Sequence, residues 1–168
     1  MDIFVEQIVQ VKKGAREWAI IIGVILAGVA VLTVVAHIAL FIFPFLAAGV
    51  GWVAWYVLTA QSREFEYSIT NGTIDVDLIV AKRRRKRVVS VSGSKIERFV
   101  PYSQEIAAER FDRQVYAWTS SEDLTTAWMF TYRSQKSGHT LVVFTPNEKV
   151  LNAARSGLSP LVRRAGEK

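Results

Sequence analysis

The chain has 168 residues, a formal net charge of +6 and no cysteine. Without cysteine, the chain has no disulfides, no thiolate metal site and no thiol nucleophile, which excludes several classes of enzyme. Hydrophobic residues make up 51% of the chain, and many of them lie in one continuous stretch. The residues outside this stretch are enough for only one small folded domain.

The N-terminal segment carries apolar side chains at helical spacing. Phe4, Ile8 and Val11 recur three or four positions apart, and Asp2 is available as an N-cap. This spacing predicts an amphipathic helix within residues 1–17, lying either on the membrane surface or against the folded domain. The segment is too mixed in charge for the n-region of a signal peptide, so we expect an uncleaved anchor.

A long apolar stretch follows. From Trp18 to Thr59 the chain contains no Asp, Glu, Lys or Arg. One helix of about 20 residues crosses a hydrocarbon core of roughly 30 Å, and its backbone groups are satisfied within the helix. The stretch is long enough for two such helices, and Pro44 is suited to the first turn of the second. The sequence therefore predicts a transmembrane hairpin with spans near residues 18–38 and 43–60.

Positive charges flank this hairpin. The residues before the first span include Lys12, Lys13 and Arg16. Arg63 follows the second span, whereas the turn between the spans offers only His37. The positive-inside rule then places both termini in the cytoplasm of a two-span plasma-membrane protein.

Small residues recur in both spans and allow helix backbones to approach closely. They are Gly23, Ala27, Gly28, Ala47 and Gly51. We expect them to pack the two helices of one hairpin together, with a homodimer interface as the alternative. No charged side chain lies within either span, so a channel or transporter has no supporting residue.

The remaining chain, residues 61–168, is expected to be rich in β-structure. Polar and apolar residues alternate over Glu64–Ile69 and over Ile74–Leu78, and Asn71-Gly72 between them is a strong signal for a two-residue hairpin loop. Further strands are expected at Arg87–Val91, Ile96–Val100, Gln114–Thr119, Ala127–Arg133 and His139–Phe144.

A C-terminal helix is predicted over residues 146–165, because Thr145, Pro146 and Glu148 form a start signal. Gly157 and Pro160 favour a break within it. About seven strands closed by one helix is the order of elements in pleckstrin-homology (PH)-like barrels, and an open antiparallel sheet carrying one helix is the alternative. The fold class predicted is therefore an α+β membrane protein, a transmembrane helical hairpin followed by a β-rich domain with a C-terminal helix.

Three features of the N-terminal half of the chain stand out together. They are the opening Met1-Asp2-x-Phe4-x-Glu6-Gln7-Ile8-Val9, the apolar hairpin, and Glu64-Phe65-Glu66-Tyr67-x-x-Thr70-Asn71-Gly72-x-Ile74-Asp75-Val76-Asp77 followed by Ala81–Arg87. Together they resemble a family of small Gram-positive bacterial membrane proteins of unknown function. The resemblance implies a bacterial plasma membrane and an intracellular tail, and it supplies no catalytic residues.

The charge surplus lies in one short run. From Gln61 onward the chain has 18 Lys and Arg against 12 Asp and Glu, and a run of six basic residues equals the whole surplus. The run is Lys82, Arg83, Arg84, Arg85, Lys86 and Arg87. A basic cluster near an inner leaflet attracts anionic headgroups at about 1 kcal/mol per Lys or Arg. We therefore expect a non-enzymatic module that binds anionic lipid or a protein partner through this run.

Other interpretations stay open. Glu64, Glu66, Asp75 and Asp77 share one face of the first hairpin, so arginines of the next strand could pair with them and make the run structural or merely topogenic. A structural subunit of a larger membrane complex, with contacts through the helices or as a homo-oligomer, is the alternative function. A membrane-tethered nucleic-acid binder ranks third. No catalytic residue, cofactor or metal ligand is assigned.

Overall fold

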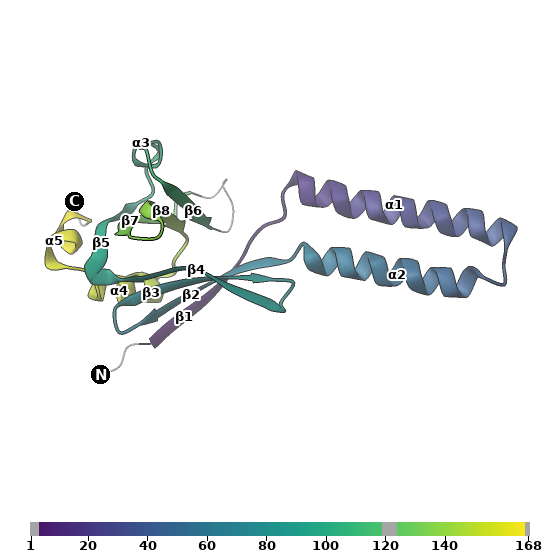
Figure 1. Cartoon of the computed structure of the whole chain (residues 1–168), viewed down its shortest axis with the longest axis horizontal. Helices are drawn as coiled ribbons and strands as arrows, with labels where there is room; N and C mark the ends of the chain where they lie inside the picture. The colour runs from purple at the N-terminus through teal and green to yellow at the C-terminus, as the bar shows by residue number, and fades with distance from the viewer. Residues whose placement is uncertain (1–3, 119–123, 167–168) are drawn as a thin grey trace. The chain divides into compact units, whose positions relative to one another are not determined.

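The computed structural model describes residues 4–118 and 124–166 and divides into two compact units. The first, here the β domain, comprises Met1–Val11, Glu64–Ile79 and Arg85–Lys168. The second, here the hairpin unit, comprises Lys12–Arg63 and Val80–Arg84. Figure 1 shows the strands of the first unit and the two long helices of the second.

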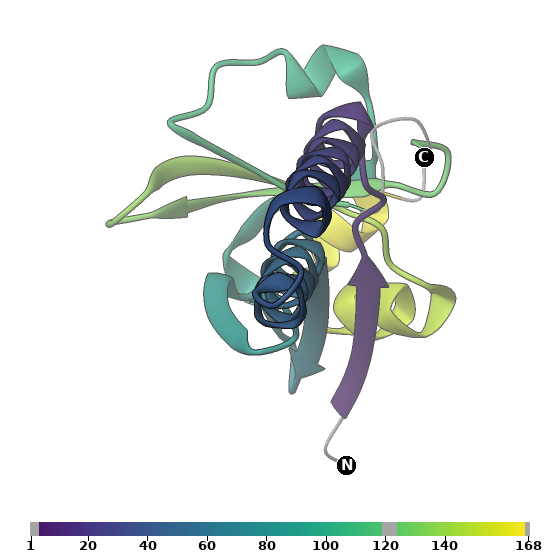
Figure 2. The ribbon, with the colours of Figure 1, turned by 90° about the vertical axis from the view of Figure 1, so that its right-hand side faces the viewer.

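The hairpin unit is built on two apolar helices, α1 (Ala15–Ile38) and α2 (Phe43–Ala60), which pack side by side (Figure 2). Both are long and apolar enough to cross a membrane, and they match the predicted spans closely. Helix α1 starts slightly earlier than predicted, because the Glu17 side chain accepts a hydrogen bond from the Gly14 backbone N–H at 3.0 Å. Pro44 lies in the first turn of α2, as predicted.

The N-terminal segment is a strand, so the prediction of an amphipathic helix within residues 1–17 is wrong. Strand β1 (Phe4–Gln10) pairs antiparallel with β2 (Arg63–Thr70), with Val9 opposite Phe65. Val9 packs in the core of the β domain, whereas Phe4 and Ile8 remain exposed. The alternation that buries one face of a strand overrode the helical spacing, because β1 completes a sheet edge.

Side-chain hydrogen bonds also hold β1 to a distant part of the chain. The Gln7 amide donates to the Thr145 carbonyl at 3.2 Å and accepts from the Asn147 N–H at 2.7 Å. Helix α4 (Glu148–Ser156), which begins directly after Asn147, lies beside β1 (Figure 2). Contacts between the two ends of the chain have no local signal, which is why sequence spacing alone favoured a helix.

Two four-stranded sheets make up the β domain in the described residues. Their strand orders are β1-β2-β3-β4 and β5-β7-β8-β6. The remaining strands are β3 (Thr73–Val80), β4 (Arg84–Ser92), β5 (Ile96–Pro101), β6 (Arg113–Ala117), β7 (Trp128–Ser134) and β8 (Gly138–Phe144). Each predicted strand is present with small shifts at its ends, and Thr119, at the end of one of them, lies outside the described residues. Strand β6 pairs parallel with β8, an arrangement that the sequence did not indicate.

The two sheets share one core, so the alternative of a single open sheet is wrong. Fully buried side chains from both sheets meet there with those of α4, and the largest are Tyr67, Phe99, Phe130 and Phe144. A smaller cluster around Met129, Leu141 and Val143 includes Ile106 and Ala107 of α3 (Gln104–Ala107). The two clusters lie on opposite faces of β7 and β8, which explains why residues 129–132 and 140–144 are buried without interruption.

The C-terminal helix is divided at the position that Gly157 and Pro160 indicated. Helix α4 ends at Ser156, and α5 (Pro160–Ala165) follows with its own cap, the Ser159 side chain. The N-cap of α4 is Asn147, whose side chain accepts from the Val150 N–H at 2.9 Å, rather than Thr145. A Cβ at Gly157 would lie 2.5 Å from the Cα of Gly72, so the break also allows two backbones to touch.

Candidate functional site

The basic run begins in a tight turn between β3 and β4. The Arg83 N–H donates to the Val80 carbonyl at 3.1 Å, and Ala81 and Lys82 both have a φ of 55°. Two left-handed residues between paired strands form a type I′ turn, which normally favours Asn-Gly. Asn71-Gly72 supplies that pair in the preceding hairpin. The second turn has neither residue, so its backbone is held in an unfavourable conformation.

Contacts with the end of α2 hold this turn in place. The Ala81 N–H donates to the Ser62 carbonyl at 2.8 Å. The Arg83 guanidinium lies over the ring of Trp55, 5.0 Å from its centroid, which is within the range of a cation–π interaction. Both contacts lie inside the hairpin unit. They keep the segment Lys82–Arg84, here the basic turn, beside the C-terminal end of α2.

A pocket of about 210 Å³ lies between the basic turn and α2. Its lining residues are Tyr56, Thr59, Ala60, Val80, Ala81, Arg83 and Arg84. Arginine presents a planar fork of donors that suits a phosphate or a carboxylate, and the helix side adds a phenol and apolar surface. The arrangement is therefore suited to the headgroup and upper chain of an anionic amphiphile. The sequence did not indicate that Trp55 and Tyr56 would lie beside the run.

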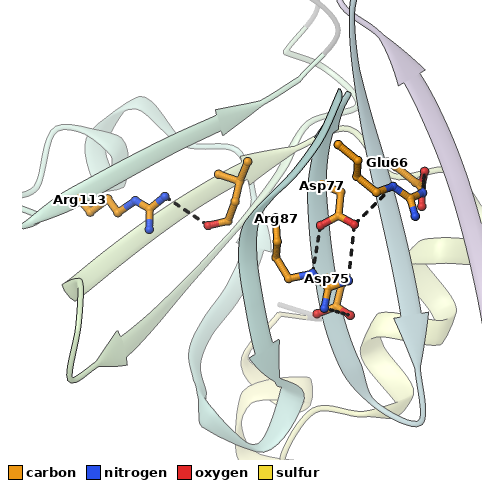
Figure 3. Close-up of polar contacts among 7 residues, drawn as sticks. Glu66, Asp75, Asp77, Arg87 and Arg113 are labelled. Carbon is orange, nitrogen blue, oxygen red and sulfur yellow. Dashed lines mark hydrogen bonds and ion pairs between the residues drawn. The ribbon is translucent and has the colours of Figure 1, made fainter. Parts of the chain in front are cut away.

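The other half of the run has a structural role. Arg85 on β4 forms an ion pair with Glu66 and lies 3.7 Å from an Asp77 oxygen. Arg87 donates to Asp77 from Nε at 3.0 Å and from Nη2 at 3.5 Å, and its Nη1 lies 3.5 Å from Asp75 Oδ2 (Figure 3). We call these five residues the charge ladder. Arginines of the next strand therefore do pair with the acidic face, as one alternative interpretation of the sequence proposed.

Burial explains why the ladder matters. Glu66 and Asp77 are only 5% exposed, and a buried carboxylate is costly unless a cation or a donor satisfies it. The hydrogen bond to Glu66 raises the pKa of Arg85, and the one to Asp77 raises the pKa of Arg87. Both guanidiniums therefore remain charged, and they pair with carboxylates of the neighbouring strands. The run predicted as one binding surface thus divides into a basic turn and a charge ladder, with Lys86 exposed between the two arginines of the ladder.

Arg113 also links the edge strands of the two sheets. Arg113 of β6 donates to the Val88 carbonyl of β4 at 3.2 Å, as the left side of Figure 3 shows.

Within residues 4–118 and 124–166, no group of three His, Asp or Glu side chains is placed to hold a metal ion. His139 Nε2 lies 3.5 Å from Glu97, and its ring packs against Phe111.

The small residues of the two helices differ in how closely the neighbouring helix approaches them. A Cβ at Gly28 would lie 2.8 Å from Val50 Cγ1, so Gly28 does allow close packing within the hairpin. At Gly23 and Gly51 a Cβ would meet no described atom within 4 Å, so these two glycines do not bring the helices of one hairpin together. Ala27 lines an open apolar groove with Gly28, and Ala47 is half-buried.

The similarity of this chain to known proteins lies at the level of a family. No curated protein and no solved structure matches the chain at a significant level. The family described as "Bacterial PH-like domain (DUF6106)" matches residues 1–160, which includes the apolar helices and both sheets. The expected kinship with an uncharacterised bacterial family and with PH-like domains is therefore confirmed. The chain belongs to the family of bacterial PH-like domains of unknown function.

Proposed function

We propose that this chain is a non-enzymatic, membrane-anchored module whose basic turn binds anionic phospholipid headgroups. The observation that carries the proposal is the placement of Lys82, Arg83 and Arg84 beside the end of α2, with Arg83 stacked on Trp55. Aromatic rings at the end of an apolar helix are typical of the headgroup level of a membrane. Cations held at that level lie where lipid phosphates lie.

The apolar hairpin supports anchoring in a membrane. Large apolar side chains along it are exposed, including Leu26 at 63% and Phe45 at 73%. Such a surface is unfavourable in water and favourable in lipid. Lys13 Nζ lies 6.0 Å from the centroid of the Trp18 ring at the start of α1, and Arg83 lies over Trp55 near the end of α2. The start of α1 and the end of α2 therefore each carry a cation beside an aromatic ring. We infer two spans with both termini in the cytoplasm, in agreement with the positive-inside rule.

The expected strength of headgroup binding is modest. At about 1 kcal/mol per cation near an anionic surface, the three residues of the basic turn supply about 3 kcal/mol, or roughly a hundredfold enrichment. This attraction is screened by salt, whose Debye length is about 8 Å at physiological ionic strength. The pocket beside Arg83 and Arg84 adds a defined position for one headgroup.

Thermal stability in detergent tests this function. The full chain, purified in a zwitterionic detergent, is heated with added phosphatidylglycerol or phosphatidylcholine. A ligand that binds only the folded state raises the unfolding temperature. We expect phosphatidylglycerol to raise it for the native chain and for Lys149→Gln/Arg163→Gln/Arg164→Gln, but not for Lys82→Gln/Arg83→Gln/Arg84→Gln. Equal effects of both lipids on the native chain would contradict the proposal.

A second candidate function is that of a subunit in a larger membrane complex. The open backbone surface at Gly23, Gly49 and Gly51 favours it, because glycine faces permit close helix contacts in membranes. The groove beside them, lined by Val24, Ala27, Gly28 and Val50 among others, has a volume of about 530 Å³. Gly49→Leu should then remove a copurifying membrane protein or a dimer, whereas Ala48→Leu should not. Unchanged copurification with Gly49→Leu argues against this role.

A further inference from the structure

A second basic site lies in the β domain, separate from the basic turn. A pocket of about 510 Å³ is formed where β4 passes into β5 and where β7 turns into β8. Its cations are Lys95, Arg133 and Lys136, and its hydroxyls come from Ser90, Ser92 and Ser134. All six residues belong to one compact unit, so their gathering is a property of the fold.

The charges at this pocket differ from those of the charge ladder. Arg85 and Arg87 each hold buried carboxylates, which explains their position. Within the described ranges, Lys95 and Lys136 form no ion pair, and Arg133 reaches only Glu97, at 4.0 Å. Three cations around one concave surface repel each other, and no acidic residue lines the pocket in the described chain. An anion bound there would remove the repulsion.

The lining also indicates what kind of anion fits. Phosphate offers three acceptor oxygens, and the pocket offers three cationic donors together with serine hydroxyls. The volume lies within the roughly 300–1,000 Å³ of small-molecule sites, although the lining is more polar than most such sites. The one aromatic residue in the lining, Tyr132, is 6% exposed, so it offers no face on which a nucleobase could stack.

We propose that this pocket binds a small phosphate-bearing anion, so that the β domain carries a ligand site independent of the basic turn. The phosphate belongs either to a free phosphorylated compound or to a lipid headgroup, and both present the same chemistry to Lys95, Arg133 and Lys136. Local hydrogen bonds hold the segments that carry the two lysines, because the Lys136 N–H donates to Ser134 Oγ at 3.3 Å and the Ser92 and Ser94 hydroxyls lie 3.0 Å apart.

Titration of the full chain with inorganic pyrophosphate tests the site. The protein is kept in a zwitterionic detergent at low salt, and binding heat is measured for three proteins. We expect saturable binding by the native chain and a loss of affinity of about tenfold or more in Lys95→Gln/Lys136→Gln. Lys149→Gln/Arg163→Gln removes the same charge from α4 and α5 and should bind within about twofold of the native chain.

The source of the phosphate and the independence of the site follow from two further arms. If pyrophosphate does not saturate the native chain, the same proteins are placed in nanodiscs and their retained phosphatidylglycerol is counted. A deficit specific to Lys95→Gln/Lys136→Gln then assigns the site to lipid phosphate. Lys82→Gln/Arg83→Gln/Arg84→Gln should leave the pyrophosphate titration unchanged. Equal losses in both lysine-site and control variants, or no effect of either probe, overturn the proposal.

Discussion

At the scale of single residues, Tyr67 joins three elements of the β domain. Its side chain is fully buried, and its hydroxyl donates to the Ala117 carbonyl of β6 and accepts from the Thr145 N–H at 3.3 Å. Its ring packs edge-on against Phe144. Burial raises the pKa of Tyr67 to about 12, because the phenolate would lose its hydration.

This raised pKa predicts a stability change at alkaline pH. Since the folded pKa of about 12 lies above the ordinary 10.0, the stabilisation is fully present below pH 10 and is lost as the pH rises to 12. Two pKa units correspond to about 2.7 kcal/mol. The stability advantage of the native chain over Tyr67→Phe should therefore shrink between pH 10 and 12, as measured by chemical denaturation in detergent. An advantage that stays constant over this range would contradict the assignment.

At the scale of elements, the two halves of the basic run should separate by mutation. Arg85→Gln/Arg87→Gln leaves Glu66 and Asp77 buried without their cations, so the unfolding midpoint of the full chain should fall. The preference for phosphatidylglycerol in the thermal assay should persist in this variant. If the lipid preference disappears while stability is unchanged, the ladder belongs to the binding surface.

The two type I′ turns allow a reciprocal test of strain. Ala81→Asn/Lys82→Gly introduces the residues that this turn favours, and it should stabilise the full chain by about 1–2 kcal/mol. Asn71→Ala/Gly72→Lys places the unfavourable pair in the other hairpin and should destabilise it by a similar or larger amount. Gly72 also touches Gly157, so a side chain there would clash as well. A loss of stability in Ala81→Asn/Lys82→Gly would show that the turn is not strained.

Sequence predicted some elements well for physical reasons. The two apolar helices follow from the absence of charge between Trp18 and Thr59, and the first hairpin follows from Asn71-Gly72 between alternating strands. Strand β1 was missed because Phe4 and Ile8 fit a helical period, while its actual partner, β2, begins only after both apolar helices. The parallel pairing of β6 with β8 likewise depends on tertiary contacts alone.

The candidate site was predicted only in part, for a similar reason. Charge counting located the run, but only three-dimensional placement separates Lys82–Arg84 beside α2 from Arg85 and Arg87 on the charge ladder. The alternation of Asp75 and Asp77 did contain the signal for the ladder. Nothing local in the sequence indicated the second basic pocket, because its cations come from a 3₁₀ turn, a strand and a hairpin loop.

At the scale of the whole molecule, the apolar hairpin is inserted between two paired strands. Residues 11–14 join β1 to α1, and two residues, Gln61 and Ser62, join α2 to β2. The two apolar helices are thus an insertion between two strands that are neighbours in one sheet.

The most direct test of membrane anchoring with headgroup binding is a count of retained lipids. The full chain is placed in nanodiscs of equal phosphatidylglycerol and phosphatidylcholine, and the lipids that stay bound after release are identified by native mass spectrometry. We predict enrichment of phosphatidylglycerol on the native chain and on Lys149→Gln/Arg163→Gln/Arg164→Gln, and its loss in Lys82→Gln/Arg83→Gln/Arg84→Gln. A native chain that fails to enter nanodiscs, or that retains both lipids equally, would contradict the account.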